Sequence, residues 1–399
     1  MNPKNFIFLL FPALLFGGNL LNDLKQKELK FDKERSIQDS KETEKSWINP
    51  ITLKYSYSKD DTLENIKTIN RTFSISVNQP IFKSGAIYYS IKYAKHSRKY
   101  DLLNIEMQRR ELIKQALDFA YDYKISKLNQ KIILLNIDNA KIDIQKKKEE
   151  FLNGVGDSTF LNNAILKLND LKLNLEDIKS NLNNLKYSFK NISYLDIEKV
   201  NLPVFKFISK ERYLKSNLEL LSQKKLKKVK YDLYKMQVGN QLLSVNLNGS
   251  LNWKKTGYSQ NTLQFEDNRN DYYRFGFSVT LPISFNAVNK IQKSKIDYLK
   301  SQILIEDKKL QLNNTYKKII NQIQTLEKKI KIYKENIKIY DDLITSTFDS
   351  IEAGNATELD LKIMQNSRKT MFVNIEILKL KKQKLLLSLY YKLNNWNKW

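Results

Sequence analysis

Apolar side chains recur at steps of three and four residues along a long stretch in the second half of the chain. The steps alternate almost strictly, and the positions between them carry mostly Lys, Asn, Gln and Glu. This spacing is typical of a coiled-coil seam, because it keeps one stripe of a helix against a partner helix. The seam runs through Leu312, Tyr316, Ile319, Ile323, Leu326, Ile330, Tyr333, Ile337, Tyr340, Ile344, Phe348 and Ile351.

Two stretches without any Gly or Pro, residues 86–153 and 286–353, predict two long helices. They are offset by 200 positions, from 86 to 286. We expect each to be one uninterrupted helix of ~100 Å, at a rise of ~1.5 Å per residue. A helix of that length cannot fold back into an ordinary compact core. It must therefore lie against other long helices.

A short turn and a second amphipathic helix follow each long helix, and we expect these return helices over 158–188 and 357–393. Gly at the end of a helix suits a left-handed C-terminal cap. Asp, Ser or Thr at the start of the next helix suits an N-cap. Each half of the chain thus predicts a long helical hairpin, whose tip residues are Gly154, Gly156, Asp157, Gly354, Asn355 and Thr357.

Four runs ahead of the long helices alternate apolar and small polar residues with a period of two. They cover residues 51–58, 71–81, 243–254 and 272–283. A period of two predicts strands with one apolar and one polar face. The runs have about 8 to 12 residues, close to the ~9–11 that a tilted membrane strand needs. Aromatic residues gather near their ends, as in the interfacial girdles of membrane barrels.

The polar faces of these runs carry mostly Ser, Thr, Asn and Gly, as expected of a wet lumen. The polar segments 59–70 and 255–271 are expected to be loops outside the cell. A soluble β-sandwich, with the apolar face packed on protein, is the alternative. It needs a second sheet, and four strands separated by long helical hairpins offer no candidate for one.

The two halves of the chain resemble one another, which predicts an internal duplication. Aligning the strand-to-helix junctions at Pro80 and Pro282 places Phe73 on Phe275 and Val77 on Val279. The predicted first repeat is residues 19–198 and the second is 210–399, with a connector at 199–209. Helices at 20–45 and 210–237 are expected ahead of the two strand pairs.

The N-terminal residues predict an export signal. Lys4 precedes an apolar run at residues 6–16, and small residues follow it. We expect a signal peptide at 1–18, since the run is too short for a spanning helix, which needs ~20 apolar residues.

Composition excludes several classes of protein. The chain has 399 residues, no Cys and one His, so it has no disulfide framework and no zinc–thiolate or His-rich metal site. The net charge is +26, but the basic residues are spread along the chain, which favours a solvated surface over a nucleic-acid interface. The sequence predicts no cofactor, no metal site and no catalytic residue, and therefore no enzyme.

Four strands are too few to close a barrel, since small barrels need ~8. A sheet in lipid cannot keep an open edge, because its unpaired N–H and C=O groups find no water there. Copies of the chain must therefore pool their strands. Two copies give eight strands, and side chains fill the interior of a barrel of that size. Three copies give twelve strands and leave a lumen.

Together these features resemble the TolC-like outer-membrane efflux proteins over essentially the whole mature chain. The segment 78–82, NQPIF, is similar to the family's junction between strand and long helix. The segments 151–161 and 351–361 are similar to its two helical tips, in which a Gly and a Ser or Thr precede the return helix.

The resemblance implies an α+β membrane protein that works as a homotrimer. Four strands per chain would form a twelve-stranded β-barrel in outer-membrane lipid, continuous with a coiled-coil α-helical barrel in the periplasm. It implies docking on a periplasmic adaptor (membrane fusion) protein and an inner-membrane transporter. The function implied is a passive exit channel for multidrug efflux, type I protein secretion or both.

The resemblance also places candidate site residues. Asp360 falls where the family has an acidic ring at the periplasmic pore constriction, and Glu358 is a neighbouring acid. Other family positions differ here: a second acid is Ile363, a basic residue is Ala356, and the first-tip acid is Phe160. We therefore expect a looser or differently held gate, with three carboxylates of Asp360 attracting cations.

Two other functions stay open from the sequence. An exported structural or adhesive coiled coil would have a rod without a barrel. A basic coiled coil that binds nucleic acid would have clustered charge, no signal peptide and no strands of period two.

Overall fold

The structure, a computed structural model, describes residues 20–63, 66–260 and 266–395. The predicted signal peptide lies outside the described residues. The chain divides into two compact units. The helical unit comprises Met1–Lys30, Glu106–Glu219 and Lys309–Trp399, and the sheet unit comprises Phe31–Ile105 and Leu220–Lys308.

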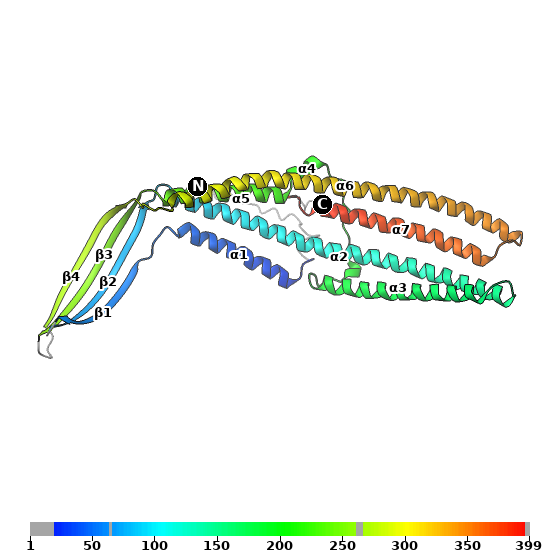
Figure 1. The fold of residues 1–399 in the computed structure, drawn as a ribbon, viewed down its shortest axis with the longest axis horizontal. Coiled ribbons are helices and arrows are strands. Elements are labelled where there is room, and N and C mark those ends of the chain that lie inside the picture. The colour runs from blue at the N-terminus through cyan, green and yellow to red at the C-terminus, as the bar shows by residue number, and fades with distance from the viewer. Residues whose placement is uncertain (1–19, 64–65, 261–265, 396–399) are drawn as a thin grey trace, which may run out of the picture. The chain divides into compact units, whose positions relative to one another are not determined.

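Two strands, a long helix and a shorter helix occur in the same order in both halves of the chain (Figure 1). The predicted long helices are present and uninterrupted. In chain order the elements are α1 (Asp23–Lys45), β1 (Thr52–Leu63), β2 (Ile66–Phe82), α2 (Ala86–Leu152), α3 (Ser158–Lys190), a short 3₁₀ turn η1 (Ile197–Lys199), α4 (Lys210–Lys215), α5 (Leu218–Asn240), β3 (Ser244–Gln260), β4 (Glu266–Thr280), α6 (Ala287–Glu352) and α7 (Glu358–Tyr390).

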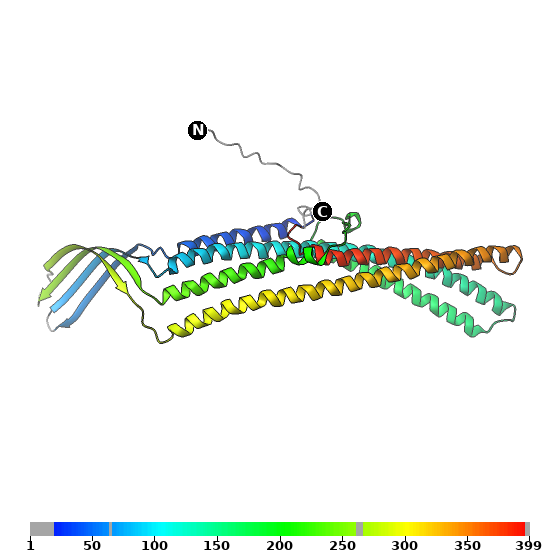
Figure 2. The same cartoon turned by 90° about the horizontal axis from the view of Figure 1, so that it is seen from above.

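The strands of the sheet unit form one antiparallel sheet in the order β1-β2-β3-β4 (Figure 2). They are longer than the predicted runs, because large parts of both predicted loops are paired strands: residues 59–63 pair with 66–70, and residues 255–258 pair with 266–269. An antiparallel ladder continues through polar sequence, since both faces can be solvated while the backbone stays paired. β1 and β4 each have one edge without a partner strand in the described chain.

The apolar face of the sheet is uncovered in the described structure. On β4, Tyr273 is 77%, Phe275 is 76% and Phe277 is 74% exposed. The β-sandwich alternative required this face to pack on protein, and the exposure contradicts it. Further exposed apolar residues on the strands are Leu53, Tyr55, Tyr57, Phe73, Leu251, Trp253 and Val279.

Aromatic and polar contacts join helices inside the sheet unit. The Tyr231 ring of α5 lies 6.4 Å from Tyr89 of α2 and 5.3 Å from Tyr298 of α6, centroid to centroid. His96 Nδ1 lies 2.5 Å from the carboxylate of Asp232, which is 3% exposed. The single histidine of the chain thus has a structural contact, between α2 and α5.

In the helical unit, tyrosines of three helices fix the segment between α3 and α4. The hydroxyl of Tyr121 donates to the Pro203 carbonyl at 2.5 Å, and that of Tyr390 donates to the Lys206 carbonyl at 2.9 Å. Tyr316 donates to a third carbonyl of this segment, that of Ile208, at 2.8 Å. The apolar core includes a cluster of Ile125, Val373 and Ile377.

The helix predicted at 210–237 is interrupted. α4 ends at Lys215, and the chain then pairs with the segment after α7. Leu218 N–H donates to the Lys392 carbonyl at 2.8 Å, and Asn394 N–H donates to the Ser216 carbonyl at 2.8 Å. These backbone bonds compete with the helical ones and explain the break before α5. Across the described residues, none of the helices is both long and apolar enough to span a membrane.

Candidate functional site at the helical tips and strand junctions

The first tip joins α2 to α3 through a turn closed by backbone hydrogen bonds. The N–H groups of Val155 and Gly156 donate to the Glu150 carbonyl at 2.9 and 3.1 Å. Gly154 has φ 71°, a left-handed conformation that a residue with a Cβ adopts at a cost. Asp157 then caps α3 by accepting from the N–H of Thr159 at 2.9 Å, and this bond lowers the pKa of Asp157.

The second tip, between α6 and α7, has the same design at matching positions. The N–H groups of Asn355 and Ala356 donate to the Ser350 carbonyl at 2.8 and 3.2 Å. Gly354 has φ 73°. All six predicted tip residues therefore lie in the two turns or at the helix cap that follows each, and the two glycines predicted as left-handed caps have that conformation.

Asp360 closes a capping box at the start of α7. Its carboxylate accepts from the Thr357 N–H at 3.1 Å and from the Thr357 hydroxyl at 2.6 Å. In return, the Thr357 hydroxyl accepts from the Asp360 N–H at 3.3 Å. This reciprocal arrangement satisfies N–H groups that have no partner within the helix.

The other carboxylate oxygen of Asp360 accepts a hydrogen bond from the ammonium group of Lys146 on α2. The contact with Lys146, followed by the bonds from Thr357, lowers the pKa of Asp360 to about 2. The carboxylate is thus ionised at neutral pH, and a cation of the same chain offsets its charge. Lys146 was not predicted as a partner, because 214 positions separate it from Asp360 in the sequence.

Further polar contacts hold α7 along its length. Arg368 lies 2.5 Å from the Asp341 carboxylate of α6, and Asn366 donates to Asn139 of α2 at 2.8 Å. Glu358, the second acid predicted at the constriction, is exposed at the first position of α7. The described structure therefore ties Asp360, and not Glu358, to a neighbouring helix.

The first strand-to-helix junction, in the sheet unit, is held by side-chain bonds of Gln79, the residue before Pro80. Gln79 accepts from the N–H of Asn49 at 3.0 Å and donates to the Trp47 carbonyl at 3.0 Å. The register between β2 and β3 shifts directly after Pro80, between it and Phe82. A proline cannot donate to a strand ladder, which fits its place beside this irregularity.

Ser84 and Gly85 follow in the same junction with φ 44° and 83°. Gly239, near the end of α5, lies against them. A Cβ on Gly239 would lie 2.7 Å from both Ala86 N and Ser84 O. Gly239 was not among the predicted site residues. The available signal was its position, because a glycine inside a helical stretch can mark a close approach of another backbone segment.

The second junction is built differently. β4 ends at Thr280, and Pro282 lies in an irregular segment before α6. Ile283 and Phe285 are fully or nearly fully exposed there, at 92% and 108%. The hydroxyl of Ser284 donates to Asn286 at 2.6 Å, and the Ala287 N–H donates to the Ser284 carbonyl at 3.0 Å.

A family model matches part of the second half of the chain. The family model described as "Outer membrane efflux protein" matches residues 211–386. The resemblance to the outer-membrane efflux proteins is confirmed. Residues 211–386 carry the sequence pattern of this family, and solved structures show that its channel fold extends over nearly the whole chain.

Three solved structures illustrate the outer-membrane efflux fold. The outer membrane protein VceC of Vibrio cholerae has a TM-score of 0.75 at 10% identity, with 94% of each chain covered. The CmeC outer membrane channel of Campylobacter jejuni has a TM-score of 0.74 at 15% identity, covering 94% of this chain and 84% of its own. The open state of the MtrE outer membrane channel of Neisseria gonorrhoeae has a TM-score of 0.65 at 12% identity, covering 94% of this chain and 86% of its own. No protein of curated function matches the sequence.

Proposed function

We propose that the chain is one subunit of a trimeric exit channel in the outer membrane, extending into the periplasm. Each subunit contributes four strands to a shared twelve-stranded barrel, and the helices continue the conduit. The channel is passive and serves a tripartite export system. One observation carries this proposal: among the residues that the structure describes, the sheet exposes its apolar face and has no partner strand at either edge.

The exposed aromatic and aliphatic residues of the strands are the first argument for a lipid environment. Tyr273, Phe275 and Phe277 lie on one face of β4 and are each about three-quarters exposed. Contiguous apolar surface of this kind marks a contact with a partner or a membrane. Lipid suits it, because the apolar residues extend across all four strands rather than filling a local groove.

The unpaired edges are the second argument. In lipid, each unpaired N–H and C=O group costs several kcal/mol, on the order of the penalty for burying a polar group without a hydrogen bond. β1 of one subunit and β4 of the next can satisfy each other. Three subunits close the ring with a lumen, whereas two would make a barrel that side chains fill.

The turns at the helical tips support a proposed role in docking and gating. Two turns of matching design close the α2–α3 and α6–α7 hairpins, and Asp360 links α7 to α2 beside the second turn. We propose that the tip residues contact a periplasmic adaptor, which in turn couples to an inner-membrane transporter. The contact between Lys146 and Asp360 takes the place of the family tip residues that are absent here.

The absence of cysteine in the sequence allows a direct test of strand sharing. Lys54→Cys on β1 is combined in one chain with Cys at Tyr272, Arg274 or Gly276 on β4. Two strands lie between these positions, so the cysteines of one chain are about 14 Å apart, too far for a disulfide. Oxidation in membranes is expected to give covalent dimers and trimers for at least one pair.

The matched control is Ser74→Cys with Asn252→Cys, which face each other on β2 and β3. This pair is expected to cross-link within one chain and to give no dimer. If every β1–β4 pair stays monomeric while the control pair oxidises, the shared barrel is refuted. The exported coiled-coil alternative predicts that result. Deleting the gene and measuring both drug sensitivity and secreted proteins then assigns the exported class.

A further inference from the structure

The polar face of the sheet carries three cations in three neighbouring rows of otherwise neutral residues. The register places residues of all four strands in rows across this face. Thr52, Ser76, Ser250 and Arg274 form one row; Lys54, Ser74, Asn252 and Tyr272 form the next; and Ser56, Thr72, Lys254 and Asn270 form the third.

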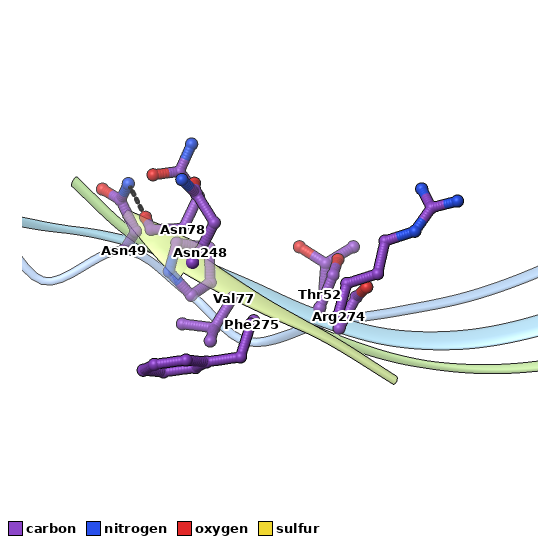
Figure 3. A pocket seen from close by; sticks show the side chains of 12 residues that line it. Asn49, Thr52, Val77, Asn78, Asn248, Arg274 and Phe275 are labelled. Atoms are coloured by element: carbon purple, nitrogen blue, oxygen red, sulfur yellow. Dashed lines mark hydrogen bonds between the residues drawn. The ribbon is translucent and has the colours of Figure 1, made fainter. Parts of the chain in front are cut away.

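Arg274 extends over a hollow on this face. The hollow measures ≈ 580 Å³ and is lined by Thr52, Ser76, Asn78, Asn248 and Ser250 among others. In Figure 3, Arg274, Asn78 and Asn248 point to one side of the sheet, while Val77 and Phe275 point to the other. The guanidinium group of Arg274 lies 4.9 Å from the Tyr272 ring centroid, which holds it over the sheet.

None of the three rows that hold these charges contains a carboxylate. In the described part of the chain, none of Lys54, Lys254 and Arg274 has an ion-pair partner. The acids on this face, Asp60 and Glu266, share one row, which is six residues beyond Lys54 and four beyond Lys254, thus about 20 Å and about 13 Å away along the strands. Both distances exceed the Debye length of ~8 Å at physiological ionic strength, so salt screens these acids from the three cations.

We propose that the strand lumen selects anions and that Lys54, Lys254 and Arg274 are its specificity-determining residues. This rests on the proposed function, since it needs the polar face to line a closed barrel. Nine cations then surround one lumen with low-dielectric walls, which concentrates anions and excludes cations. Solutes bearing carboxylate, phosphate or sulfonate groups are the class of substrate that this lumen favours.

Placement, rather than total charge, carries the inference. Lys255 is the chain neighbour of Lys254 and lies on the opposite face, in the row of Arg71 and Arg269. Two lysines adjacent in sequence thus differ in the face that they occupy. Of these two lysines, the lumen mechanism predicts that Lys254 affects ion selectivity and that Lys255 does not.

The test is the reversal potential of the purified protein in planar bilayers under a KCl gradient. The natural protein is expected to pass chloride better than potassium. A variant with Lys54→Gln, Lys254→Gln and Arg274→Gln is expected to lose about sevenfold in the chloride-to-potassium permeability ratio. That factor corresponds to a lumen potential lower by about kT/e, which acts on anion and cation with opposite sign.

The control is Lys255→Gln, which is expected to leave the permeability ratio unchanged. The selectivity of the natural protein should also fall between about 0.1 M and about 1 M salt, because the Debye length shrinks from ~10 Å to ~3 Å. Citrate, a small polyanion added on the strand side, should reduce current more in the natural protein than in the triple variant.

Three outcomes separate this inference from the proposed function. Channels with equal selectivity in the natural protein and the triple variant overturn the inference and leave the channel standing. An equal loss of selectivity in Lys255→Gln also overturns it, because face then has no effect. Absence of channel currents from every protein overturns the proposed function, and the inference with it.

Discussion

Gly239 provides the sharpest test of how the helices and strands of the sheet unit are joined. It is the penultimate residue of α5, where the helix approaches the turn between β2 and α2. In Gly239→Ala the new methyl carbon would lie 2.7 Å from Ala86 N and from Ser84 O, and 3.0 Å from Ala86 Cβ. Two of these three atoms are backbone, so no side-chain rotation relieves the contact.

The turn itself resists movement. Ser84 has φ 44°, and its hydroxyl donates to the Leu243 carbonyl at 2.6 Å. Overpacking costs about 1–3 kcal/mol, and rigid backbone atoms favour the upper part of that range. Alanine recovers about 1 kcal/mol as the better helix former. We therefore expect Gly239→Ala to destabilise the sheet unit by about 1–2 kcal/mol.

The assay is thermal unfolding of the purified protein in detergent, followed by circular dichroism. At about 2–4 °C per kcal/mol for a unit of 150–250 residues, the midpoint should fall by about 2–8 °C. Gly249→Ala is the matched control, because its new methyl would be at 3.5 Å from Val77 Cγ1, an ordinary contact. A Gly239→Ala protein as stable as the natural one would refute the close approach, and an equal loss in Gly249→Ala would refute the assigned cause.

Three further predictions concern the helical unit. Lys146→Gln removes a partly exposed ion pair worth about 0–1 kcal/mol, so the open probability in bilayers should rise by up to about fivefold per subunit. Lys146→Arg keeps the charge and should retain the natural open probability. An equal open probability in both variants would show that the ion pair does not stabilise the closed state. Because the folded-state pKa of Asp360 is lowered to about 2, the stabilisation that its carboxylate contributes is present above about pH 4 and is lost as the pH falls toward 2. The open probability should therefore be constant from pH 7 to 5. A change in the natural protein within that window, abolished by Asp360→Asn, would show that Asp360 titrates there and would contradict its ion pair with Lys146. Tyr121→Phe removes the bond to the Pro203 carbonyl and should cost about 1–3 kcal/mol in thermal unfolding, with Tyr187→Phe, at a 67% exposed position, as the unaffected control.

Periodicity predicted the elements whose residues have one dominant environment. The long helices and four strands lie where steps of 3.5 and of two residues placed them, since each buries or exposes a continuous stripe. The extension of β1 and β2 through residues 59–63 and 66–70 was not predicted. Polar residues on both faces of a paired strand resemble a loop, and pairing there is determined by the neighbouring strand.

Contacts between distant segments explain the other differences. The break between α4 and α5 contains no Gly or Pro, and it depends on backbone bonds to the segment following α7. The Lys146 contact depends on which helix lies beside the start of α7. Spacing along one helix contains neither piece of information, so sequence analysis located Asp360 but not its partner.

In the channel proposed above, the environment of Asp360 bears on which functions belong to the helical tips and which to the strand lumen. An acidic ring attracts cations only in proportion to the charge that its own chain leaves uncompensated. Lys146 compensates Asp360 within each chain, whereas Lys54, Lys254 and Arg274 have no ion-pair partner among the described residues. The Lys146–Asp360 ion pair is therefore suited to holding α2 and α7 together, and the proposed strand lumen is suited to selecting the exported solute by its charge. Two measurements on Asp360→Asn and on the triple lumen variant separate these roles: the open probability reports gating, and the reversal potential reports the permeability ratio. Asp360→Asn should change the open probability and leave the permeability ratio unchanged. The triple variant should change the permeability ratio and leave the open probability unchanged.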